Sequence, residues 1–253
     1  MLWAIDVGNT HTVVGVWRED HWHAVWRLET DRHKTEDELA ILLKGLCDLE
    51  SIPWSCRGAV IGSVVPSVTP IWKAFFGDRF GKTLKVLERG DQVGLTVKYD
   101  PPHGVGADRI ANALGGAALF PAPLIVIDFG TATTFDVINQ DGNYIGGAIL
   151  PGVIVSMEAL ASKAAKLPPI ALRKPEKAIG RNTVESLESG LLWGSAGAIN
   201  EVGKRIREEL GQDAKIIATG GLGPVFVELC PDVESHHPNL TLDGLRIAFD
   251  RLP

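Results

Sequence analysis

Hydrophobic residues in the first part of the chain alternate between the spacing of strands and the spacing of helices. Three short apolar runs predict strands, and they span residues 3–7, 12–17 and 22–28. A polar turn at Arg18-Glu19-Asp20 separates the last two runs and predicts a hairpin. Thr35 and Glu38 have the spacing of a capping box, which marks the start of a helix. Leucines continue this helix at positions 39, 42, 43, 46 and 49.

The alternation of strands and helices continues as far as residue 119. We expect further strands over residues 59–62, 84–87 and 95–97, and a helix over residues 107–119. Another helix is expected to begin with Thr69 as its cap. Pro70 then occupies the first helical position, where a missing N–H does no harm. This order of elements predicts an α/β fold.

The start of the chain recurs at an offset of 122 residues. Four positions of the first copy, Ile5, Asp6, Gly8 and Thr12, correspond to Ile127, Asp128, Gly130 and Thr134. Each copy combines a strand, an Asp-x-Gly turn with hydroxyl residues, and a second strand. After the second copy we expect a helix over 183–210, capped by Asn182, and a strand over 215–219. The repeat predicts two related domains over residues 1–118 and 119–253.

Composition narrows the class of protein. The 253 residues are 45% hydrophobic and 22% charged, which excludes a disordered chain. The net charge of −6 offers no basic field for a nucleic acid, so we expect no such partner. Three unevenly spaced cysteines form neither a zinc pattern nor a disulfide framework. We find neither a leader nor a run long enough to span a bilayer, and expect a cytoplasmic protein without a membrane partner.

The Asp-x-Gly turns carry the first candidate chemistry. Glycine lets the backbone approach a ligand closely, and the N–H groups and hydroxyls of such a turn suit phosphate oxygens. The aspartate would repel phosphate unless a cation lies between them. One such turn is usually an ordinary hairpin. Two copies favour the binding of a metal-bound polyphosphate.

Two competing phosphate motifs fail on their context. Gly77–Thr83 is one residue short of a P-loop and precedes a strand instead of a helix, and Gly104–Arg109 lacks the last glycine of a dinucleotide fingerprint. Gly106-Ala107-Asp108-Arg109 instead opens a helix, whose N-terminus favours anions. There Arg109 can bind a carboxylate and Asp108 can accept a hydroxyl proton. On spacing alone, a surface ion pair remains the alternative.

Three segments closely resemble the signatures of type III pantothenate kinases, and they are Asp6-Val7-Gly8-Asn9-Thr10, Gly106-Ala107-Asp108-Arg109 and Asp128-Phe129-Gly130-Thr131-Ala132. The resemblance continues through Asn182-Thr183-Val184-Glu185 and Gly220-Gly221. That family belongs to the acetate and sugar kinase, Hsp70 and actin superfamily. The resemblance implies two duplicated ribonuclease H-like domains with mixed sheets flanked by helices. It also implies a homodimer that transfers the γ-phosphoryl group of ATP to pantothenate, the first step of coenzyme A biosynthesis.

The resemblance also assigns roles to individual residues. The residues that would bind ATP are Asp6, Val7, Gly8, Asn9, Thr10, His11, Thr12, Val13 and Thr131. Asp6 would face Mg²⁺, directly or through water, and Asp128 would bind K⁺ or NH₄⁺. Asp108 would accept the proton. The pantothenate pocket would comprise Tyr99, Gly106, Ala107, Asp108 and Arg109, with Thr183 of the partner subunit.

Two other functions are compatible with this resemblance. One is phosphorylation of a different small molecule by a member of the same superfamily. The other is a catalytically silent accessory transcription factor, as relatives of this family have been named. The intact set of Asp6, Asp108 and Asp128 argues against the silent protein.

Overall fold

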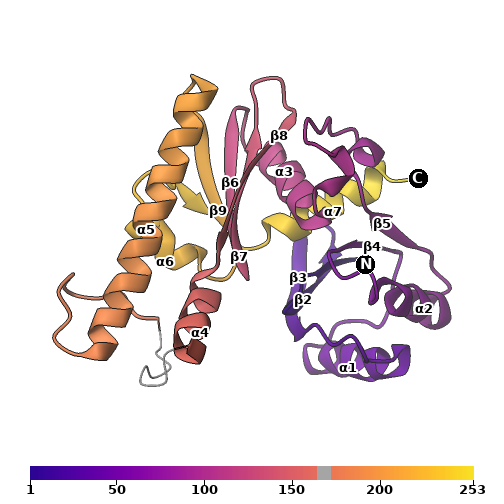
Figure 1. Cartoon of the computed structure of the whole chain (residues 1–253). Coiled ribbons are helices and arrows are strands. Elements are labelled where there is room, and N and C mark those ends of the chain that lie inside the picture. The colour runs from indigo at the N-terminus through magenta and orange to yellow at the C-terminus, as the bar shows by residue number, and fades with distance from the viewer. Residues whose placement is uncertain (164–171) are drawn as a thin grey trace. The chain divides into compact units, whose positions relative to one another are not determined.

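The computed structural model describes residues 1–163 and 172–253, and these divide into two compact units. Unit 1 comprises Met1–Gly115 together with Leu240–Pro253, and unit 2 comprises Gly116–Asn239. Each unit contains a five-stranded mixed sheet with helices packed on it (Figure 1). The α/β fold is therefore confirmed. The predicted border at 118/119 lies close to the observed one, but residues 240–253 belong to the first unit.

The sheet of unit 1 has the order β3-β2-β1-β4-β5. Its strands are β1 (Leu2–Val7), β2 (His11–Arg18), β3 (His21–Glu29), β4 (Gly58–Ser63) and β5 (Leu84–Leu87). Strand β1 pairs antiparallel with β2 and parallel with β4. The predicted hairpin is confirmed, but the strand expected over 95–97 reduces to a single bridge at Val97. Two short 3-10 helices, η1 (Gly90–Val93) and η2 (Pro102–Gly104), lie in this part of the chain.

The sheet of unit 2 repeats this topology, with the order β10-β9-β6-β7-β8. Its strands are β6 (Leu124–Phe129), β7 (Ala132–Ile138), β8 (Tyr144–Pro151), β9 (Lys215–Thr219) and β10 (Ser235–His236). The turn after the first strand is one residue shorter than in unit 1, because Phe129 pairs with Thr133 where Val7 pairs with Thr12. The structural counterpart of Thr12 is therefore Thr133, and the sequence match to Thr134 is wrong by one position.

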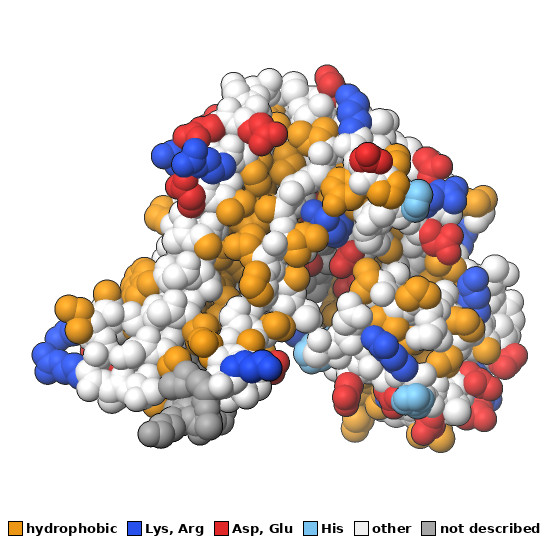
Figure 2. Space-filling model, viewed as in Figure 1, with side chains coloured by type: hydrophobic (Ala, Val, Ile, Leu, Met, Phe, Trp, Pro, Cys, Tyr) orange, Lys and Arg blue, Asp and Glu red, His pale blue; other side chains and the backbone are white. Residues whose placement is uncertain are grey.

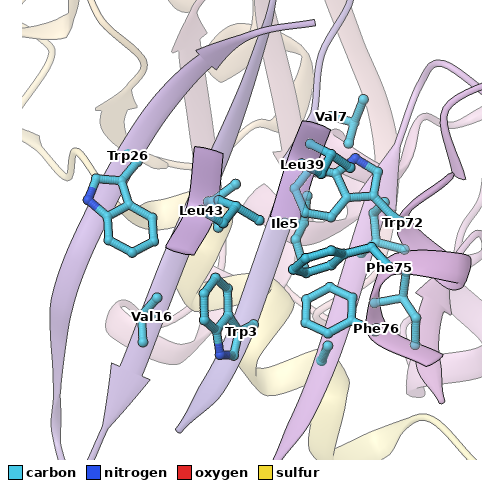
Figure 3. Packing of buried hydrophobic residues seen from close by; sticks show 14 of the residues in the cluster. Trp3, Ile5, Val7, Val16, Trp26, Leu39, Leu43, Trp72, Phe75 and Phe76 are labelled. Carbon is cyan, nitrogen blue, oxygen red and sulfur yellow. The ribbon is translucent and has the colours of Figure 1, made fainter. Parts of the chain in front are cut away.

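One face of the first sheet packs against α1 (Glu36–Leu49) and α2 (Thr69–Phe80). Trp3, Ile5, Trp72, Phe75 and Phe76 are almost fully buried there (Figure 3). Each such side chain stabilises the fold by roughly 1.5–3 kcal/mol relative to exposure. The capping box of α1 forms as predicted. Helix α2, however, has Val68 at its N-cap without a side-chain hydrogen bond, so Thr69 is the first helical residue and does not cap it.

The other face of the first sheet is covered by α7 (Leu240–Arg251). Helix α3 (Ala107–Leu119) begins beside this face, where Ala107 lies close to Gly62, and packs against α7 through Gly115 and Gly244. Trp22 Nε1 donates a hydrogen bond of 2.9 Å to Asp243 Oδ1, and Lys85 Nζ donates to the carbonyls of Phe249 and Leu252. These contacts join residues far apart in the sequence. They explain why the last segment of the chain lies in unit 1.

Three helices accompany the second sheet, α4 (Val153–Lys163), α5 (Thr183–Leu210) and α6 (Gly223–Leu229). Asn182 caps α5 as predicted, because its side chain accepts a hydrogen bond from the Glu185 N–H. In the core of this unit, Phe129 and Phe226 stack with ring centroids 4.7 Å apart. Within the described parts of the chain, no helix has both the length and the apolar character needed to cross a membrane.

Candidate active site

The side chain of Asp6 lies on the face of the first sheet that α3 and α7 cover. Strand residues alternate between faces, and Ile5 and Val7 belong to the core on the opposite side. Asp6 pairs in parallel register with Gly62 of β4. A Cβ atom at Gly62 would lie 3.4 Å from the Cβ of Ala107, the first residue of α3. The first candidate aspartate therefore points to the side of the sheet on which α3 begins.

Asp108 lies one residue further into α3. Burial raises the pKa of its carboxyl group, and this effect is opposed by the hydrogen bond from the Arg109 N–H and by the charge of Arg109. That N–H donates to Asp108 Oδ1 over 2.8 Å. A raised pKa suits a general base that must take a proton near neutral pH. The structure thus brings Asp6 and Asp108 to the same face of one unit.

Gly106 makes the position of the Asp108 carboxylate possible. A Cβ atom at this position would overlap Asp108 Oδ1 and would approach Val64 Cγ1 to 3.3 Å. Val64 itself follows β4, and its N–H donates to the Val7 carbonyl over 3.0 Å. The ends of β1 and β4 and the start of α3 therefore form one packed region.

The turn after β1 is largely exposed at Asn9, Thr10 and His11. The Gly8 N–H closes it by donating to the His11 carbonyl over 3.0 Å. Val7 and Thr12 differ from these residues, since they are only 0% and 3% exposed. Almost no surface of either residue is therefore open to a ligand in this structure. Val13, the last residue of the predicted ATP segment, pairs with Asp6.

Thr30 is a component of this turn that the sequence analysis missed. Its hydroxyl donates to the Gly8 carbonyl over 2.8 Å, and its N–H donates to the Thr10 carbonyl over 3.0 Å. The residue directly follows β3, so the hairpin topology could have indicated it. No local motif marks it.

A cleft of about 550 Å³ within unit 1 adjoins the start of α3. Gly106 and Ala107 line it together with the end of β4, the start of α2 and the end of β5. His103 and Lys73 add polar groups to the lining. Tyr99 lies nearby, since a Cβ atom at Gly104 would be 3.9 Å from its ring. The volume falls within the range of small-molecule sites, roughly 300–1,000 Å³.

Unit 2 holds the remaining predicted residues. Asp128 lies at the end of β6, where its Oδ1 would be 2.5 Å from a Cβ atom on Gly220. Thr131 is exposed in the short turn between β6 and β7, and the Gly152 N–H donates to its carbonyl over 3.1 Å. Thr183 is exposed at the first turn of α5. The second Asp-x-Gly turn thus has the same place in its sheet as the first.

No group of three or more metal-binding side chains occurs within residues 1–163 and 172–253. Single carboxylates such as Asp6 nevertheless fit Mg²⁺ that arrives with a nucleotide. Such an ion keeps several waters and takes most of its protein contacts from one or two carboxylates, the rest coming from phosphates.

Comparison with known families agrees with this arrangement. The model of the type III pantothenate kinase family matches residues 2–205, a range that includes both Asp-x-Gly turns, the start of α3 and Thr183. The chain belongs to the type III pantothenate kinase family. The expected family membership is thereby confirmed.

Solved structures share the fold of this pantothenate kinase family member at low identity. A Campylobacter jejuni protein described as a conserved Baf family transcriptional activator is 18% identical, with a TM-score of 0.62 over 98% of this chain and 97% of that one. The activator of 2-hydroxyisocaproyl-CoA dehydratase from Clostridium difficile, solved with bound ADPNP, is 11% identical, with a TM-score of 0.57 over 98% and 94%. A Sinorhizobium meliloti protein described as a 2-dehydro-3-deoxygalactonokinase is 15% identical, with a TM-score of 0.55 over 98% and 96%. These likenesses establish the two-domain fold.

Proposed function

We propose that the protein transfers the γ-phosphoryl group of ATP to the hydroxyl group of pantothenate. The observation that carries this proposal is the placement of Asp6 and partly buried Asp108 on one face of unit 1, where Gly62 next to Asp6 lies close to Ala107 next to Asp108. The family membership supplies the donor and the acceptor. The cleft beside Gly106 is large enough for a molecule of this size.

Each candidate site residue of unit 1 would have a distinct role in this reaction. The exposed turn at Asn9 and Thr10 offers N–H and hydroxyl groups to phosphate oxygens. Asp6 would hold the Mg²⁺ that accompanies ATP, and that ion neutralises charge on the transferring group. Asp108 accepts the proton of the acceptor hydroxyl. Arg109 is only 8% exposed, and its guanidinium would hold the acceptor in place with Tyr99.

Unit 2 would supply a phosphate contact and a cation site. Thr131 is exposed in its turn, and the Asp128 carboxylate lies beside the Gly220 backbone. A carboxylate supplies the oxygen ligands that hard cations prefer. We assign K⁺ or NH₄⁺ to Asp128 in this proposal.

We further propose that the active form is a homodimer. Unit 2 exposes large apolar side chains on helices α4 and α5. They are Ile154, Val155, Leu160, Val184 and Trp193, which we call the apolar face. Figure 2 shows hydrophobic side chains exposed over this unit, with charged ones towards its ends. Thr183 begins the same helix as Val184 and Trp193, so a second copy bound here would also meet Thr183.

The cytoplasm suits the thiols of this chain. Cys47, Cys56 and Cys230 are free, and burial raises the pKa of each thiol to about 11. Such thiols are unreactive near neutral pH and persist where the compartment is reducing. The net charge of −6 separately argues against a nucleic acid as the partner.

Release of ADP in a coupled assay tests the function directly. Purified protein with ATP, Mg²⁺, K⁺ and pantothenate should produce ADP and a phosphorylated product, identified by mass spectrometry. Other small hydroxy acids and sugars form the comparison panel, because the site defines the donor more closely than the acceptor. If another acceptor of the panel is strongly preferred, that compound replaces pantothenate as the proposed substrate. If no acceptor is phosphorylated, the result favours a catalytically silent regulator.

A further inference from the structure

Thr30 makes three hydrogen bonds to the turn that follows β1. Its hydroxyl lies 2.8 Å from the Gly8 carbonyl and 2.9 Å from the Thr12 hydroxyl, and its N–H lies 3.0 Å from the Thr10 carbonyl. A carbonyl oxygen only accepts, so the Thr30 hydroxyl donates its proton to Gly8. The Thr12 hydroxyl then donates to the Thr30 oxygen. One side chain thereby links both strands that flank the turn.

These bonds fix the direction of two peptide groups. In a trans peptide the C=O and the following N–H point in opposite directions. Because the carbonyls of Gly8 and Thr10 are directed at Thr30, the N–H groups of Asn9 and His11 are directed away from it. Thr30 therefore fixes the direction of two N–H donors of the turn.

The repeat in unit 2 shows which part of this arrangement is general. Gly152 follows β8 as Thr30 follows β3, and its N–H donates to a turn carbonyl in the same way. A Cβ atom at Gly152 would overlap the Thr131 carbonyl oxygen and lie 2.6 Å from that of Gly130. The backbone bond is thus common to both units. The hydroxyl bonds belong to unit 1 alone, in which the turn is one residue longer.

We propose that Thr30 is a positioning residue for ATP, acting through the Gly8–Thr12 turn. It does not touch the nucleotide itself. Its hydroxyl holds the longer turn in the form that presents its N–H groups to the phosphates. This inference rests on the proposed use of that turn for ATP.

Two variants separate the hydroxyl from the shape of the side chain. Thr30→Val keeps the branched shape and the backbone N–H but removes the hydroxyl, whereas Thr30→Ser keeps the hydroxyl. We expect Thr30→Val to raise the KM for ATP about tenfold, the effect of losing well-aligned hydrogen bonds. The KM for pantothenate should change less than about twofold, because the acceptor cleft lies elsewhere in the unit. Thr30→Ser should keep the KM for ATP close to that of the wild type.

Thr35→Val is the matched control. It removes a threonine hydroxyl from the capping box of α1 and lowers stability without touching the turn. If Thr35→Val raises the KM for ATP as much as Thr30→Val, the effect is general destabilisation and the proposal is wrong. Circular dichroism melting shows whether each variant folds, with Thr30→Ala as the replacement if the valine variant does not. Failure of both to fold would make Thr30 purely structural and overturn the proposal.

Binding of MgATP by titration calorimetry keeps the two proposals distinguishable. If the wild type binds MgATP and Thr30→Val binds it equally well, the role of Thr30 is refuted and the kinase function stands. If the wild type binds no MgATP, the nucleotide assignment fails and the role of Thr30 fails with it. Tenfold weaker binding by Thr30→Val with recovery in Thr30→Ser supports the proposal whatever the acceptor is.

Discussion

Asp108 is partly buried and lies at the start of a helix. Its replacement by asparagine keeps the shape of the side chain and the acceptor for the Arg109 N–H, but removes the proton acceptor. We expect Asp108→Asn to fold and to lose turnover by about 10²–10⁴-fold, the usual contribution of a general base. Steady-state kinetics with pantothenate and ATP measure the loss. Turnover near that of the wild type would remove Asp108 from this role.

The raised pKa of Asp108 also has a consequence for stability. Below the pKa of the unfolded chain both states are protonated, and the group contributes nothing. As pH rises, the unfolded state loses its proton first, so ionisation costs folded-state stability, fully so above the folded pKa. Asp108→Asn should therefore be more stable than the wild type at pH 7 and equal to it near pH 3. Urea denaturation at both values tests this, and a variant less stable at pH 7 would contradict it.

Asp128 connects the activity to the choice of monovalent salt. If its carboxylate binds K⁺ or NH₄⁺, replacing these ions by Na⁺ at constant ionic strength should lower turnover sharply, because Na⁺ is smaller and more strongly hydrated. The measurement is the ADP assay in matched chloride salts. Equal rates in all three salts would remove the cation from Asp128.

At the scale of elements, α7 depends on one lysine of β5. The last carbonyls of a helix have no partner within it. Here Lys85 Nζ donates to the Phe249 carbonyl over 3.0 Å and to the Leu252 carbonyl over 2.6 Å, and lies 4.7 Å from the centre of the Phe249 ring. Lys85→Met should lower the free energy of unfolding by roughly 1–3 kcal/mol. Exposed Lys82 is the control, since Lys82→Met should change the free energy of unfolding by less than about 0.5 kcal/mol. Similar losses in both variants would contradict a specific role for Lys85.

Elements with local signals were predictable from the sequence. The capping box at Thr35 and the cap at Asn182 involve atoms within a few residues, so their patterns identify both helix starts. The packing of α7 depends on Trp22 and Lys85, which are far away in the sequence, and no periodicity reports such contacts. The same reason hides Thr30, which lies 22 positions from its acceptor Gly8. The expected strand over 95–97 failed because a short apolar run fits a buried loop equally well.

For the whole molecule, the apolar face predicts the oligomeric state. Trp193 is 41% exposed on α5, and a charge there would be costly to bury against a second copy. The wild type should have twice the chain mass of 27.2 kDa in light scattering, and Trp193→Arg should have the mass of a single chain. Ile41, 76% exposed on α1, is the matched control, and Ile41→Arg should leave the mass unchanged. A monomeric wild type would refute the dimer.

The assignment of α7 to unit 1 has a consequence for biosynthesis. A ribosome completes unit 2 before it makes residues 240–252, which cover one face of the first sheet. Until then, the nascent first unit exposes the surface around Trp22 that will receive Asp243. The unit translated first is therefore the one finished last. A nascent chain stalled near residue 239 would contain a folded insertion while the first sheet still lacks α7.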